Sequence, residues 1–238
     1  MMFETDRSNV PRAYLPLSGD NEADLSIALR WLTEAGLAAG QRIGVQIPSR
    51  DAIRENPALQ GLDRRGLASF ATWRHSSANK TVTGPQLSFF PNLEMLLTLE
   101  DRRTAALVVL GVHDSHRAWV SAYDVPSLGV SSVDALPAPD PVLKAALATF
   151  TNSVNSSTGI TDPRDKSRVV DGLQKLKRAG FSFTRDQLVA EALRHNWRGS
   201  AAFALGNVGA EVLAGKQKRV RETYRDNIVD LWRDDARD

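Results

Sequence analysis

Apolar positions in the first half of the chain follow two alternating periods. Residues 20–35 repeat leucine and alanine at spacings of three and four, which is typical of one face of a helix that Asp20 can cap. Short β-rich runs follow at residues 42–47, 67–73 and 86–90, and the run at 105–112 is continuously apolar, as a doubly covered strand should be. Strands separated by helices favour parallel crossover units. We therefore predict an α/β domain over residues 20–125, a short Rossmann-like parallel sheet with flanking helices.

The second half of the chain carries only helical periodicity. Four segments repeat apolar residues at helical spacing, and Thr184 and Gln187 form a capping-box pair. The segments lie at about residues 165–179, 184–195, 200–214 and 221–232. This pattern predicts a C-terminal helical bundle over residues 165–238.

Prolines separate the two patterns. Pro126, Pro137, Pro139 and Pro141 cannot lie inside a helix or a central strand, so residues 126–164 are predicted to be a Pro/Ser-rich connector with a short helix. Residues 1–19 precede the first periodic segment and are predicted to form a flexible N-terminal arm.

Composition excludes several kinds of site. The chain has no cysteine, which rules out a disulfide framework, a thiolate zinc site, an iron–sulfur cluster and a cysteine nucleophile. Neither a membrane span nor a secretory signal is recognisable, so we expect a cytoplasmic protein without membrane contact. No dinucleotide fingerprint, phosphate-binding P-loop or nucleophile elbow is present, so no cofactor is identified.

The charge divides unequally along the chain. The net charge of +2 comes from −3 over residues 1–140 and +5 over residues 141–238. Any polyanion should therefore bind the bundle. The basic candidates for nucleic-acid binding are Lys175, Lys177, Arg178, Lys216, Lys218, Arg219 and Arg221. The alternative interpretation is a solvated basic rim. The turn near residues 195–199 looks longer than that of a DNA-reading helix pair.

Ligands of parallel sheets bind beyond the carboxyl ends of the strands. One candidate anion site follows the run at 42–47, where Ser49 is a plausible helix cap and Arg50 and Asp51 are its neighbours. A second candidate is the polar loop after 67–73, with Arg74 and Gly84. Ordinary capping and an ordinary surface turn are the competing interpretations.

The loop after the strongest strand holds the candidates for catalysis. His113, Asp114 and His116 could provide a base oriented by a carboxylate, with His75 from the neighbouring loop. Their spacing matches no zinc motif, so no metal site is predicted. The carboxylates Glu100 and Asp101 adjoin two arginines and are interpreted as a solvated turn.

These observations favour a cytoplasmic, non-enzymatic binding protein. Its α/β domain would hold a nucleotide-like or other small anionic ligand, or a degenerate form of such a site, and its basic helical domain would contact nucleic acid or a partner protein. One alternative is a Rossmann-like enzyme with a His/Asp site, possibly metal-dependent, at residues 113–116. Another is a structural subunit of a larger assembly.

Overall fold

The structure is a computed structural model of the 238-residue chain. It describes residues 9–35, 41–72, 84–102, 104–129, 133–155, 158–216, 220–221 and 223–237, without the side chains of His113 and Ser115. The chain divides into two compact units, Met1–Asp134 and Ala135–Asp238. Among the described residues, no helix is both long and apolar enough to cross a bilayer.

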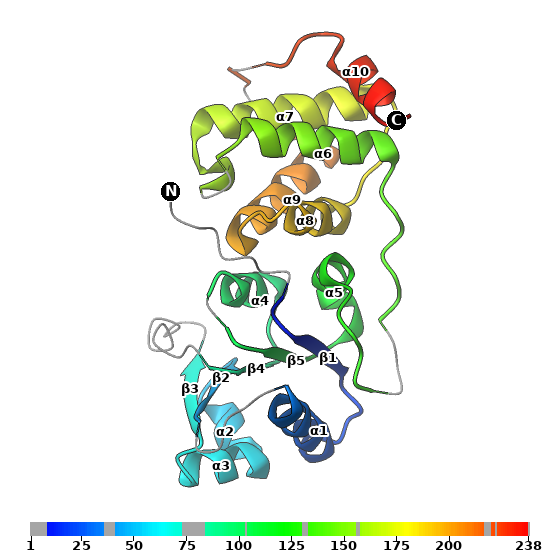
Figure 1. The fold of residues 1–238 in the computed structure, drawn as a ribbon. Coiled ribbons are helices and arrows are strands. Elements are labelled where there is room, and N and C mark those ends of the chain that lie inside the picture. Colours follow the sequence, from blue (N-terminus) through cyan, green and yellow to red (C-terminus); the bar gives the residue numbers. More distant parts are fainter. Residues whose placement is uncertain are drawn as a thin grey trace. The chain divides into compact units, whose positions relative to one another are not determined.

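The first unit is built on a sheet of five parallel strands in the order β1-β5-β4-β2-β3. The strands are β1 (Arg12–Pro16), β2 (Ile43–Ile47), β3 (Ala68–Thr72), β4 (Gln86–Phe89) and β5 (Leu107–Gly111). One face is covered by α1 (Asn21–Glu34), α2 (Asp51–Glu55) and α3 (Pro57–Arg64); the other is covered by α4 (Leu93–Glu100) and α5 (Arg117–Tyr123) (Figure 1). The predicted α/β fold class is confirmed.

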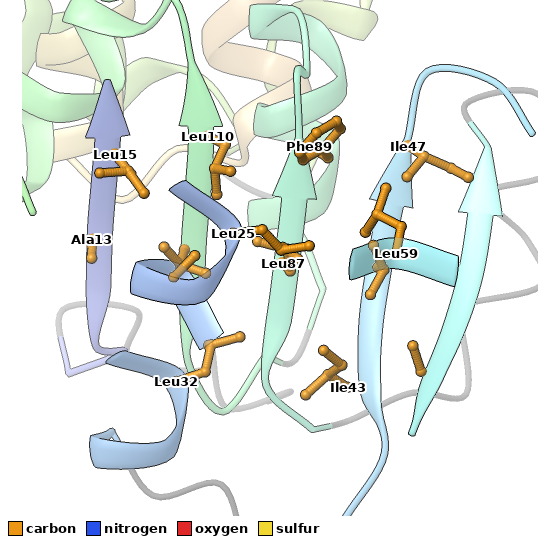
Figure 2. Packing of buried hydrophobic residues seen from close by; sticks show 14 of the residues in the cluster. Ala13, Leu15, Leu25, Leu32, Ile43, Ile47, Leu59, Leu87, Phe89 and Leu110 are labelled. Carbon is orange, nitrogen blue, oxygen red and sulfur yellow. The ribbon is translucent and has the colours of Figure 1, made fainter. Parts of the chain in front are cut away.

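The two faces of this sheet differ in chemistry, because alternate residues of a strand point to opposite faces. One face is apolar and packs with α1 and α3 into the cluster of Figure 2, where Leu25 and Leu32 of α1 and Leu59 of α3 lie against the strands. The opposite face carries polar side chains that are also buried: Arg12, Tyr14, Gln46, Gln86 and Ser88. A parallel sheet buried on both faces is normally apolar on both. The polar face is therefore an unusual feature of this unit.

Some local expectations for the first unit are wrong. Residues 12–16, expected in a flexible arm, form the edge strand β1, which pairs with β5 over its whole length. Ser49 does not cap α2, because the helix begins one residue later, with Arg50 at the cap position and no side-chain cap bond. A further helix, α3, was not expected; Asn56 caps it by accepting the amide protons of Ala58 and Leu59.

The second unit contains only helices among its described residues. They are α6 (Pro141–Ser153), α7 (Pro163–Arg178), α8 (Arg185–Arg194), α9 (Gly199–Leu213) and α10 (Ile228–Asp235), with a 3₁₀ turn, η3 (Gly159–Thr161), before α7. The expected bundle starts at residue 165, whereas the second unit includes α6. The α6 threonines bind the indoles of the bundle: Thr151 accepts from Trp197 and Thr149 accepts from Trp232. The predicted capping box of α8 at Thr184 and Gln187 is present.

Candidate functional site

The carboxyl edge of the sheet brings together only some of the predicted ligand-binding residues. Ser49, Arg50 and Asp51 follow β2 at this edge and are exposed. Gly84 precedes β4 and therefore lies at the opposite, amino edge of the parallel sheet. A side chain at Gly84 would come within 2.9 Å of the Gln41 side chain and 3.2 Å of the Arg42 carbonyl oxygen, so its small size serves packing. Arg74 and His75 lie outside the described residues.

Two of the helices that begin at the carboxyl edge, α1 and α4, have first-turn amide groups occupied by side chains of the protein. Asp20 accepts the amide protons of Glu22 and Ala23 at the start of α1, and the buried Asp24 accepts that of Ser18. Asp51, in the first turn of α2, is ion-paired with Arg54. Asn92 caps α4 through Met95. An anionic ligand at the start of α1 would have to compete with two carboxylates already in place.

His116 is a buried histidine that lies near the carboxyl ends of β4 and β5 and beside Tyr14 of β1. Its Nε2 lies 2.8 Å from the Pro91 carbonyl oxygen, and its Nδ1 lies 3.4 Å from the Tyr14 hydroxyl. Since a carbonyl only accepts, Nε2–H is the donor to Pro91. Gly111 makes room for the ring, because a Cβ there would come within 2.6 Å of His116. Burial lowers the pKa of His116, opposed by hydrogen bonds to the backbone at Pro91 and Val112.

Of the remaining members of the predicted histidine site, only Asp114 has its side chain within the described part of the structure. Asp114 is exposed, and together with burial it raises the pKa of Tyr14. The side chain of His113 lies outside the described part of the structure. No group of three or more His, Asp or Glu side chains that could hold a metal ion occurs among the described residues. The geometry therefore shows His116 as a packed imidazole that is hydrogen-bonded to the backbone.

Glu100, expected on a solvated turn, is instead a buried charge centre. Arg12 donates to both of its carboxylate oxygens, at 2.9 and 3.0 Å, and Trp119 donates its indole N–H at 2.6 Å. The Arg12 guanidinium also stacks 3.8 Å over the ring of Tyr123. This cluster joins β1, α4 and α5, so its role is to fix the helices on the polar face of the sheet.

The polar face also holds an unsatisfied hydroxyl that was not anticipated. Ser88 on β4 is fully buried, pairs in register with Gln46 of β2, and its Oγ has no hydrogen-bond partner within the described structure. On the neighbouring strand β2, Gly44 leaves room for the end of the Gln86 side chain, which a Cβ would approach to 2.1 Å. The alternation of polar and apolar residues at 43–47 and 86–89 is the signal that predicts such a face.

In the second unit, α7 is hydrogen-bonded to the chain both before and after residues 217–219. Lys177 donates to the carbonyl oxygens of Val212 and Leu213, both at 2.9 Å, where α9 ends. The amide of Arg221 donates to the Ser167 hydroxyl at 2.7 Å, ten residues back along α7. The chain between these hydrogen bonds contains Lys218 and Arg219, which lie outside the described residues.

We give the name basic strip to a set of six basic side chains of α7 and of the chain that follows α9. Its members are Arg164, Arg168, Lys177, Arg178, Lys216 and Arg221. At 100° per residue, Arg164, Arg168 and Arg178 share one side of α7, whereas Lys177 lies on the opposite side and faces the end of α9. Arg168 is half-buried and the other five are exposed. Arg164 and Arg178 are separated by about 21 Å along the helix axis at 1.5 Å per residue.

Lys175, which was also predicted to bind nucleic acid, is only partly exposed and has partners within the second unit. It is ion-paired with the buried Asp171 at 3.0 Å and donates to the carbonyl oxygens of Tyr224 and Arg225. Its charge therefore holds the segment after the basic run in place. Lys216 lies 3.7 Å from Glu211, which partly offsets its charge.

The turn between α8 and α9 has four residues, which is shorter than expected and within the range for helix–turn–helix pairs. Asn196 adopts the left-handed conformation in this turn. However, most of α9 is buried, and its exposed positions include Ser200, Asn207 and Leu213 but no lysine or arginine. α9 therefore offers no basic side chain to a phosphate, whereas the basic strip does.

A polar hollow of about 700 Å³ opens beside the basic strip, between the end of α6 and the first turns of α7. Its lining includes Thr158, Thr161, Asp162, Arg164, Asp165 and Arg168. Asp162 caps α7 through the amide of Arg164, and Asp165 accepts the amide of Asn155. Within the described structure, Arg164 has no side-chain partner and neither has the Thr158 hydroxyl. The hollow thus combines cationic, anionic and hydroxyl groups.

Residues 139–233 match the sequence family described as "Domain of unknown function (DUF1889)". The match lies within the second unit and does not extend into the α/β unit. No curated protein and no solved structure matches the chain.

Proposed function

We propose that this chain is a non-enzymatic binding protein whose helical unit binds nucleic acid through the basic strip. The observation that carries the proposal is the pair of hydrogen bonds at Lys177 and Ser167, which hold Val212 and Arg221 against α7, a helix that has arginines near both of its ends. The family match covers this same unit, which supports treating it as a module with its own role.

The chemistry of the basic strip suits phosphate. Four of its six members are arginine, whose planar guanidinium donates two parallel hydrogen bonds to a phosphate. A surface about 21 Å long corresponds to about six base-pair steps of 3.4 Å. Since each phosphate contact releases a condensed cation, binding should weaken steeply with salt.

In this proposal the α/β unit contributes a scaffold with a degenerate ligand site. Asp20 and Asp24 supply internally the negative charge that a phosphate would bring to the start of α1. His116 donates to the backbone of Pro91 from a buried position and is poorly placed to reach a substrate.

The test is fluorescence anisotropy with a labelled single-stranded RNA and a labelled DNA duplex at low salt. We expect binding by the whole chain that weakens by at least tenfold between about 50 and 200 mM salt. The variant Arg164→Ser/Arg168→Ser/Arg221→Ser should bind at least tenfold more weakly and show a shallower salt dependence. Circular dichroism checks that it stays folded.

The matched control replaces arginines of the other unit. Arg30 and Arg65 are exposed in the α/β unit, and Arg30→Ser/Arg65→Ser should leave the affinity within about twofold, since only long-range charge is altered. Undetectable binding at low salt, or an equal loss in this control, would refute the proposal. Binding of a partner protein by the same arginines, without nucleic acid, would replace it.

A further inference from the structure

The polar hollow is larger than a phosphate alone requires. Its volume of about 700 Å³ lies in the range of pockets for small organic ligands, about 300–1,000 Å³. Its cationic wall consists of Arg164 and Arg168, four residues apart and therefore neighbours on one side of α7. Both arginines also belong to the basic strip, so a chain of phosphates on the strip passes this opening.

The other groups of the hollow favour a different part of the ligand. Asp162 and Asp165 repel phosphate but accept hydrogen bonds from hydroxyl or N–H groups. One oxygen of each is already used, Asp162 Oδ1 by the amide of Arg164 and Asp165 Oδ2 by that of Asn155. The Thr158 hydroxyl can both donate and accept. The occupant should therefore carry an anionic group and, a few ångströms away, hydroxyl or N–H donors.

We propose that the polar hollow binds one ribonucleotide unit of a single-stranded RNA, with its phosphate on Arg164 and Arg168 and its sugar hydroxyl facing Thr158 and Asp165. This inference rests on the proposed function and names its substrate class. The 2′-hydroxyl is the group by which proteins distinguish RNA from DNA at a given site. A base-paired strand keeps its nucleotides stacked, whereas a single strand can turn one nucleotide into the hollow.

The experiment compares two probes that differ only in the 2′-hydroxyl: oligouridylate and oligodeoxyuridylate, each of about twelve nucleotides, within the usual site size for single-strand binding. With the whole chain, we expect the ribo probe to bind at least fivefold more tightly than the deoxy probe. Thr158→Val, which removes only a hydroxyl, should reduce that ratio to below twofold by weakening the binding of the ribo probe. Asp165→Ala should reduce the ratio in the same way.

Two further variants separate this inference from the proposed function. Thr33→Val, an exposed threonine of α1, is the matched control and should keep the full ratio. Arg164→Ser should weaken both probes. If both probes bind equally to the unaltered chain, or if Thr158→Val and Asp165→Ala keep the ratio, the hollow is not a ribonucleotide site, although the basic strip still binds nucleic acid. If neither probe binds at low salt, the proposed function itself fails.

Discussion

At the scale of single residues, the buried imidazole of His116 couples the stability of the α/β unit to pH. Burial lowers its pKa in the folded protein, while the unfolded chain titrates near the ordinary value of about 6.5. Below that pH the unfolded state binds more protons, so stability is fully present above it and is lost as pH falls. We expect the free energy of unfolding to drop by up to about 2 kcal/mol between pH 6.5 and 5, from about 1.4 kcal/mol per pH unit.

Urea unfolding at several pH values, followed by tryptophan fluorescence, measures this loss. His116→Gln retains an N–H for the Pro91 carbonyl but cannot be charged, so its stability should vary less over the same pH range. An NMR titration gives an independent check, because the His116 ring signals should shift only well below pH 6.5. If His116→Gln loses as much unfolding free energy between pH 6.5 and 5 as the unaltered protein, other groups are responsible.

The buried pair of Arg12 and Glu100 leads to a second prediction at this scale. The side chains are 4% and 2% exposed, so removing one partner leaves an uncompensated charge in the interior. Arg12→Met or Glu100→Leu alone should cost about 3–5 kcal/mol of unfolding free energy. The double variant should recover a large part of that loss. Denaturant unfolding of the four proteins measures the coupling, and additive losses would contradict it.

Glu100 also shows why single residues were hard to place from the sequence. Its local neighbours, Asp101, Arg102 and Arg103, are those of a solvated turn. Its actual partner is Arg12, 88 residues away, and the two meet only because β1 lies beside β5. Side-chain contacts across the sheet depend on the order of the strands, and that order cannot be predicted from the local pattern of apolar and polar residues.

At the scale of elements, α8 and α9 pack closely through glycines of α9. A Cβ at Gly206 would come within 2.6 Å of Val189 Cγ2 and 3.3 Å of the Arg185 carbonyl oxygen. Since valine has a stiff side chain and both residues belong to α8, the helices would have to separate. Gly206→Ala should therefore cost about 1–3 kcal/mol, although alanine favours a helix over glycine by about 1 kcal/mol.

Gly61 in α3 is the matched comparison. A Cβ there would meet no atom within 4 Å, so only helix propensity changes. Gly61→Ala should stabilise the α/β unit by about 0.5–1 kcal/mol. Thermal unfolding followed by circular dichroism measures both variants. If Gly206→Ala and Gly61→Ala both raise the stability, or both lower it, close packing at Gly206 does not determine the effect of its substitution.

Elements with local signals were the ones predicted well. The predicted caps at Asp20 and Thr184 are present, because a cap depends on residues within one turn of chain. The strand at 12–16 was missed because a five-residue segment is too short to show a clear alternation of apolar and polar residues. The last helix begins at Ile228, later than the expected start near 221, because the amides of Arg221 and Tyr224 donate to Ser167 and Asp171 of α7 instead.

At the scale of the whole molecule, charge and architecture divide at nearly the same place. The +5 segment begins at residue 141, and the helical unit begins at Ala135. The sequence located this asymmetry, since net charge needs no folding information. The candidate sites were harder to predict from the sequence. The basic strip depends on hydrogen bonds of α7 to Val212, Leu213 and Arg221, and the polar hollow brings Asn155 and Thr158 beside the first turns of α7.

The boundary of the helical unit can be tested with two fragments. Residues 135–238 contain α6, whose Leu143, Leu147 and Phe150 are fully buried and whose threonines accept the indole protons of two tryptophans. Residues 165–238, the bundle expected from the sequence, lack that helix. We expect the longer fragment to unfold cooperatively, and the shorter one to show no cooperative transition, because it exposes the apolar surface that α6 covers.

Circular dichroism in the near and far ultraviolet, recorded during heating, separates the two outcomes. The longer fragment should also keep the nucleic-acid affinity of the whole chain within about threefold, since every member of the basic strip lies inside it and the α/β unit adds only long-range charge. A cooperative transition in residues 165–238 would mean that α6 is dispensable. A folded longer fragment that has lost binding would instead assign part of the phosphate-binding surface to the α/β unit.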